Sequence, residues 1–104
     1  MVTYKVIWER HAKQTLREIF EYLRWRESIS VARRVVNQLI ATARTLEKFP
    51  TRHPKEPNLG HLPYDFRFCT VWNYKIIFEI TDTEVFILEV FHTSRNPHDI
   101  KDIL

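Results

Sequence analysis

The sequence has few residues that could cross-link the chain or place it in a membrane. It contains one cysteine, Cys69, among 104 residues, so an internal disulfide is excluded. A lone cysteine in an apolar run fits a reducing compartment and is most simply a small core residue. The apolar runs of the chain fall well short of the roughly 20 residues of a membrane-spanning helix. The N-terminus lacks the apolar region of a signal peptide. We therefore expect a soluble, cytoplasmic protein without membrane contact.

The motifs with the most specific chemistry are also missing. The chain has no phosphate-binding loop, nucleophile elbow, helical His-Glu-x-x-His or Cys-x-x-Cys. His92 and His98 are six residues apart, and His53 and His61 are eight apart, which does not match zinc-ligand spacing. We expect no metal and no cofactor.

The composition is that of a compact domain. Hydrophobic residues make up 44% and aromatic residues 13% of the chain, too many large apolar groups for a disordered protein. A length of 104 residues suits a single domain, residues 1–104. The formal net charge of +3 permits an acidic partner, although basic and acidic residues alternate along the first half as on a solvated helix face.

The first half of the chain predicts one strand and two helices. Residues 2–8 alternate apolar and polar side chains as in a half-buried strand, which should join the strands predicted after residue 62. Residues 9–27 and 31–49 repeat apolar side chains at helical spacing, and the short break between them predicts an antiparallel helical hairpin. Ser30 is the expected N-cap of the second helix.

The second half predicts three strands and a short helix. Residues 66–71, 73–80 and 85–92 are rich in β-branched and aromatic residues, and the last two flank a turn-forming segment. A three-residue loop would keep the apolar side chains on one face and set Lys75 opposite Glu89 on the other. Asn96 and Pro97 are typical of the start of a short C-terminal helix.

The order of these elements indicates an α+β fold, β-α-α-β-β-β-α. It combines an N-terminal strand, a two-helix antiparallel hairpin, a three-stranded antiparallel meander and a short C-terminal helix. The helices should pack on one sheet face and leave the other accessible.

Candidate site residues are the polar side chains that accompany the sheet. They are Arg67, Lys75, Glu89, His92 and Arg95. Cations around a general acid or base are what cleavage of an RNA phosphodiester requires. The alternative is structural: a cross-strand ion pair between Lys75 and Glu89, and a hydrogen bond from His92 to the terminal helix.

The opening strand and the two amphipathic helices lead into the segment Leu46-Glu-Lys-Phe-Pro50. The second half of the chain contains the spacings Arg67-x-x-x-Val71-x-x-Tyr74-x-Ile76-x-Phe78 and Val85-x-Ile87-Leu88-x-Val90-x-His92-x-x-Arg95-Asn-Pro97. In their order and spacing, which span nearly the whole chain, these features resemble the layout and the C-terminal signature of the RelE/ParE superfamily of toxins from type II toxin–antitoxin systems.

The resemblance implies a toxin that inhibits bacterial growth and is neutralised by a cognate antitoxin. Such pairs act in plasmid stabilisation. The toxin would form a homodimer or a hetero-oligomer with the antitoxin. ParE-like members inhibit DNA gyrase, whereas RelE-like members are mRNA interferases that cleave mRNA on the ribosome without a metal. RelE-like enzymes place an arginine where this chain has Thr70 and often a tyrosine where it has Asp99, so the departures favour the ParE-like branch. A degenerate copy would be a non-toxic binding module.

The two branches assign different roles to the candidate residues. A nuclease would use Arg67, Lys75, His92 and Arg95 as catalytic residues. A gyrase inhibitor would use the same four residues, together with Glu89, to bind its target.

Overall fold

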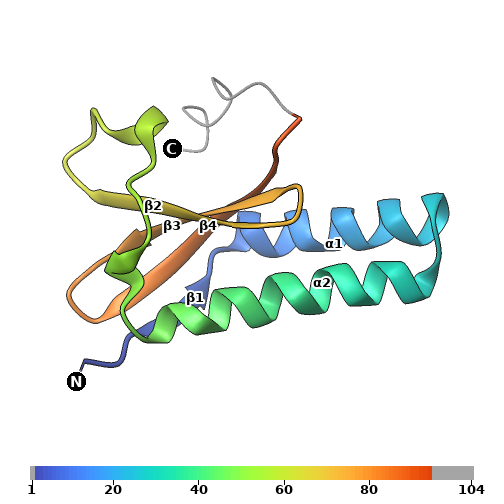
Figure 1. The fold of residues 1–104 in the computed structure, drawn as a ribbon, viewed down its shortest axis with the longest axis horizontal. Coiled ribbons are helices and arrows are strands. Elements are labelled where there is room, and N and C mark those ends of the chain that lie inside the picture. The colour runs from blue at the N-terminus through green and yellow to red at the C-terminus, as the bar shows by residue number, and fades with distance from the viewer. Residues whose placement is uncertain (1, 95–104) are drawn as a thin grey trace.

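In the computed structural model, which describes residues 2–94, two long helices pack against one face of a four-stranded sheet (Figure 1). The α+β prediction is confirmed, and the predicted C-terminal helix lies outside the described residues. The elements are β1 (Lys5–Trp8), α1 (Arg10–Arg26), α2 (Ile29–Arg44), β2 (Asp65–Val71), β3 (Tyr74–Ile80) and β4 (Glu84–His92), with short 3₁₀ turns at Thr45–Glu47, Pro50–Arg52 and Pro57–Leu59.

The strands follow the order β1-β4-β3-β2. The pairs β2–β3 and β3–β4 are antiparallel, which confirms the predicted meander. The N-terminal strand joins the sheet as expected, and it pairs with β4 in parallel, from Lys5 opposite Glu84 to Trp8 opposite Ile87. Helices α1 and α2 and strands β2 and β3 separate β1 from β4 in the sequence, which gives the long connection that a parallel pair requires.

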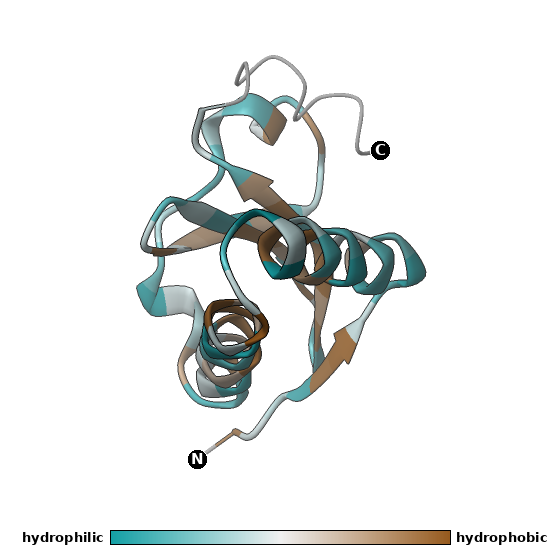
Figure 2. Ribbon diagram, turned by 90° about the vertical axis from the view of Figure 1, so that its right-hand side faces the viewer, coloured by the Kyte–Doolittle hydropathy of each residue, from teal (hydrophilic) through white to brown (hydrophobic). Residues whose placement is uncertain are grey.

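The main core lies between the helices and the sheet. Leu39 of α2 meets Ile76, Phe78 and Ile87 there, and all four side chains are fully buried. Figure 2 looks nearly along the two helices and shows apolar strands behind them and hydrophilic outer turns on α1. Burial of the apolar sides of α1 and α2 against the sheet, rather than helix propensity, stabilises the two helices.

The opposite sheet face is covered more than the sequence predicted. A second buried cluster forms there, consisting of Leu59, Phe66, Ile77, Leu88 and Phe91. The segment between Pro54 and Tyr64 supplies its cover, since Leu59 is only 1% exposed. The expectation of an accessible second face is therefore wrong for this part of the sheet.

The predicted hairpin register is also wrong. Ile80 pairs with Val85, so the loop has four residues, and a β-bulge shifts the register again between Ile77 and Phe78. Lys75 consequently pairs with Phe91, and Glu89 lies opposite Ile77. One extra residue in a strand reverses the faces of all side chains beyond it.

The start of α2 differs from its prediction by two residues. Ser28, not Ser30, has the extended backbone of an N-cap, and its Oγ accepts a hydrogen bond from the Val31 backbone N–H at 3.1 Å. The helix ends at Arg44, and the chain continues as a 3₁₀ turn. The break between the helices is therefore only two residues long, at Glu27 and Ser28.

Candidate functional site

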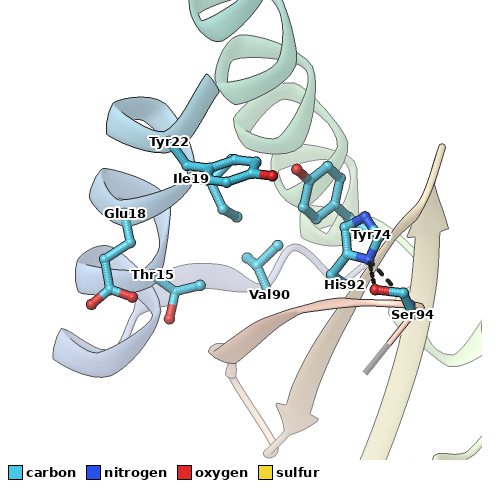
Figure 3. Close-up of a pocket in the computed structure, with 8 residues that line it drawn as sticks. All are labelled: Thr15, Glu18, Ile19, Tyr22, Tyr74, Val90, His92 and Ser94. Carbon is cyan, nitrogen blue, oxygen red and sulfur yellow. Dashed lines mark hydrogen bonds between the residues drawn. The ribbon is translucent and has the colours of Figure 1, made fainter. Parts of the chain in front are cut away.

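A cleft of about 370 Å³ lies between α1 and the ends of β3 and β4 (Figure 3). On its sheet side, Tyr74 pairs with His92 across the two strands, and their rings meet edge to face at 5.2 Å. On its helix side, successive turns of α1 present Thr15, Glu18 and Tyr22. Helical spacing of three to four residues brings these three side chains to one face.

His92 has a defined tautomer in its neutral form. Its Nδ1 accepts a hydrogen bond from the Ser94 backbone N–H at 3.1 Å and lies 2.7 Å from the Ser94 hydroxyl. Since Nδ1 acts as the acceptor, the proton of the neutral ring lies on Nε2. The imidazole can therefore offer an N–H to a ligand in the cleft.

Two tyrosines face each other across the cleft. Figure 3 shows the Tyr22 side chain directed from α1 toward Tyr74. Burial raises the pKa of Tyr74, and the nearby Tyr22 raises it further. The Tyr74 phenol is therefore protonated at neutral pH and can donate a hydrogen bond.

A second hollow, of about 600 Å³, continues from the first and shares Tyr22, Tyr74 and His92 with it. Its further lining includes Arg34 of α2 and Trp72 of the turn between β2 and β3. Trp72 has a left-handed backbone, with φ of 49°, and its side chain is 60% exposed. Positive φ is costly for a bulky residue, so the turn holds this tryptophan under strain.

Glu89 lies behind the cleft rather than on the opposite face. Its Oε2 is 2.5 Å from His11 Nε2, and its Oε1 accepts hydrogen bonds from Thr15 Oγ1 at 2.7 Å and the Val90 N–H at 2.9 Å. Glu89 is 4% exposed, and its carboxylate ties α1 to the bulged part of β4. Its role in this structure is to position α1.

Lys75 lies on the other face of the sheet. Its ammonium forms an ion pair with the Glu56 carboxylate and sits 4.1 Å above the centre of the Phe68 ring. Glu56 is 1% exposed, and its Oε2 also accepts from the backbone and side-chain N–H groups of Asn58. The predicted pair between Lys75 and Glu89 is therefore wrong, because the two side chains have different partners on opposite faces.

Arg67 joins β2 to the loop after α2. Its guanidinium bonds the Asp65 carboxylate, with Nε to Oδ1 at 2.9 Å, and Nη1 donates to the backbone carbonyls of Thr51 and His53 at 3.0 and 2.8 Å. Only 15% of the side chain is exposed. These contacts commit most of its donors to the protein itself.

The predicted residues thus do not form one cluster. His92 lines the cleft, Glu89 supports it from behind, and Lys75 and Arg67 lie elsewhere. Arg95 lies outside the described residues. None of the described residues that line the first cleft is a lysine or an arginine, so these residues do not supply the fixed positive charge that would stabilise a phosphorane-like transition state.

Sequence reasoning missed the aromatic part of the site. Tyr22 lies just beside the apolar stripe of α1, and Trp72 occupies a turn position that favours glycine or asparagine. Both are large aromatic residues outside the pattern of buried apolar positions, and this could have marked them as candidates for a binding site. His11 and Glu56 were missed because their partners are far away in the sequence.

Residues 2–94 offer neither a metal-binding cluster nor a membrane-spanning helix. No group of three or more His, Cys, Asp or Glu side chains in this range is placed to hold a metal ion. None of its helices is long and apolar enough to cross a membrane.

Comparison with known proteins gives one family and one fold. The family model described as ParE toxin of type II toxin–antitoxin system, parDE, matches residues 6–97. A solved structure of the chromosomal ParDE toxin–antitoxin system from P. aeruginosa is similar, with a TM-score of 0.73 and 18% identity over 86% of this chain and 96% of that one. No curated protein sequence matches significantly. Because the family model covers most of the sequence, this chain belongs to the ParE toxin family of type II toxin–antitoxin systems.

Proposed function

We propose that this chain arrests bacterial growth by inhibiting DNA gyrase and that a cognate antitoxin holds it inactive. Membership of the ParE toxin family supports a toxin of this branch. In this proposal the chain acts by binding its target and catalyses no reaction of its own.

One structural observation supports binding over RNA cleavage: two of the cationic candidates, Arg67 and Lys75, are already engaged within the chain. Arg67 holds a loop, and Lys75 pairs with buried Glu56 on the far side of the sheet. Thr70, where the RelE-like pattern has an arginine, offers no charge to a phosphate. Cleavage would need an acid, a base and a cation around one phosphodiester.

The candidate residues then divide into two roles. His92 belongs to the target-binding surface, since it lines both hollows. Glu89 supports that surface from behind, whereas Lys75 and Arg67 stabilise other parts of the fold through their polar contacts. Arg95 follows β4 in the sequence and is proposed as part of the same target-binding surface.

The antitoxin should supply an acidic, amphipathic segment that folds on binding. The charge of +3 attracts such a segment. Coupled folding costs ordering entropy, so tight neutralisation also needs a large apolar contact. The affinity should therefore largely survive high salt, and loss of nearly all binding would show a chiefly electrostatic complex.

The test is expression of the chain with and without the antitoxin, followed by two assays on the purified toxin. We expect growth arrest that the antitoxin relieves, inhibition of supercoiling by gyrase, and intact mRNA on programmed ribosomes. Codon-positioned cuts in ribosome-bound mRNA that disappear in His92→Ala would establish the RelE-like activity instead. Unimpaired growth with correctly folded protein would identify a non-toxic binding module.

A further inference from the structure

Three large aromatic side chains are exposed on one continuous surface of the molecule. Tyr22, Trp25 and Trp72 are 60%, 79% and 60% exposed. Tyr22 and Trp25 line a hollow of about 400 Å³ near the end of α1, and Tyr22 and Trp72 line the hollow of about 600 Å³ beside it. We call these three residues and the hollows between them the aromatic surface.

The aromatic surface contributes little to the main core. Trp25 is four-fifths exposed on the last turns of α1, and Tyr22 points into the cleft from outside the buried stripe. A contiguous apolar patch of this kind on a soluble domain typically marks an interaction site.

The backbone at Trp72 gives a second, independent reason. The φ of Trp72 is 49°, which a glycine or an asparagine would adopt with little strain. The chain nevertheless has a tryptophan, the largest side chain, at this position. That side chain lies largely in solvent, where it cannot repay the strain through burial. Strained residues are concentrated at functional sites. Phe49 has similar strain and exposure, so what distinguishes Trp72 is that it also lines a hollow with Tyr22.

Arginines surround the aromatic rings. The Arg24 guanidinium lies 5.0 Å from the centre of the Trp25 ring, that of Arg26 lies 6.0 Å from the centre of the Tyr22 ring, and Arg34 lines the larger hollow. Residues 21–34 contain four arginines and two glutamates. This stretch is therefore positively charged and complements an acidic partner.

The composition favours a protein over a nucleic acid. Tryptophan, tyrosine and arginine are the residues that dominate the binding energy of protein interfaces. A nucleic acid would instead need a continuous cationic track for its phosphates. Glu18 and Glu21 line the hollows on either side of Tyr22 and interrupt such a track.

We propose that the aromatic surface is where the toxin binds its target protein, through an apolar pocket that is surrounded by carboxylates on the target. The inference rests on the proposed function, because it assigns the surface by which the toxin acts. Trp25 and Trp72 are the anchors, and Arg26 and Arg34 pair with the surrounding acids.

The chain offers a matched control for Trp72. Phe49 is also an exposed aromatic residue with positive φ, 58% exposed at a φ of 51°. It follows the C-terminal end of α2, whereas Trp25 is near the turn between α1 and α2, at the opposite end of the helical pair (Figure 1). Trp72→Asn and Phe49→Asn should therefore both raise Tm by relieving strain, and only Trp72→Asn should affect target binding.

The experiment measures growth arrest, gyrase supercoiling, antitoxin binding and binding of single-stranded DNA for the wild type, Trp25→Ala, Trp72→Asn, Arg34→Glu and Phe49→Asn. We expect a loss of inhibitory potency on the order of tenfold or more for Trp25→Ala, Trp72→Asn and Arg34→Glu. Phe49→Asn should keep the potency of the wild type, and all four variants should still bind the antitoxin. Full potency of both Trp25→Ala and Trp72→Asn would overturn the inference. Variants that lose antitoxin binding and keep full inhibitory potency would overturn it as well. Binding of single-stranded DNA that Trp72→Asn abolishes would assign the surface to nucleic acid and overturn it too.

Failure of the proposed function gives a different pattern. A wild-type toxin that arrests growth without inhibiting gyrase refutes the proposed target. The surface is then judged by growth arrest alone: arrest lost in Trp25→Ala and Trp72→Asn but kept in Phe49→Asn supports it, and arrest kept in all variants refutes it.

Discussion

Replacing Lys75 by Met should strongly destabilise the fold, because it removes the partner of a buried charge. The Glu56 carboxylate has no solvent-exposed side-chain area, and the Lys75 ammonium forms its ion pair. The substitution keeps the length and apolar character of the Lys75 stem and deletes only the charge. It also removes the cation from the face of the Phe68 ring.

The expected cost follows from this burial. Breaking a buried ion pair by removing one partner typically costs about 3 to 5 kcal/mol. Lys75 keeps 17% of its side chain exposed, so water can reach Glu56 in part, and we expect the lower limit, about 3 kcal/mol. For a domain of this size, such a loss lowers Tm by roughly 12 to 24 °C.

Urea unfolding of single and double variants measures the effect. Adding Glu56→Gln to Lys75→Met removes the unpaired charge, and the double variant should recover roughly 1 to 2 kcal/mol of the loss. Lys55→Met is the control, since Lys55 is 71% exposed and lies 3.7 Å from Asp65, and it should change stability by less than about 0.5 kcal/mol. If Lys75→Met matched this control, the pair with Glu56 would not be a buried interaction and the reasoning would be refuted.

Three further predictions concern other buried groups. Arg67→Lys should lower the free energy of unfolding by about 2 kcal/mol in urea titrations, since an ammonium cannot bond the same carboxylate and two carbonyls together; unchanged stability would contradict the role of Arg67. Burial raises the pKa of the Cys69 thiol to about 11 from 9.0, so its thiolate fraction at pH 8 and its reaction with a thiol reagent should be about a hundredfold lower than in the unfolded chain; equal rates in water and in denaturant would show an accessible thiol. Burial, with Arg52 and Arg67 nearby, lowers the pKa of His53, so the unfolded state binds the proton more readily and stability should fall as pH drops below about 6.5; His53→Gln should lessen this fall, and an identical pH profile would refute it.

The fold could be predicted from the sequence because its elements have strong local patterns. The helical stripes of α1 and α2 and the β-branched runs of β2, β3 and β4 lie at nearly the observed positions. The N-cap was misplaced because Ser28 and Ser30 are chemically equivalent, and only the backbone identifies which one begins α2.

The site was harder to predict because it depends on one irregularity. The bulge in β4 turns Glu89 toward His11 and Thr15, although simple alternation placed it with Lys75. The partner of Lys75 is Glu56, in a loop whose path no periodic pattern describes. Long-range polar contacts of this kind follow from the tertiary structure, and local sequence does not encode them.

The function proposed for this ParE family member, inhibition of DNA gyrase, can be measured in vitro. The most direct test is supercoiling of relaxed plasmid by purified gyrase in the presence of increasing amounts of the toxin, with and without its antitoxin. We predict dose-dependent inhibition that stoichiometric antitoxin abolishes and that Phe49→Asn retains. The contrary result is undiminished supercoiling in the presence of a large excess of toxin over gyrase, with toxin that still arrests growth in cells. It would contradict the proposal that the toxin inhibits gyrase.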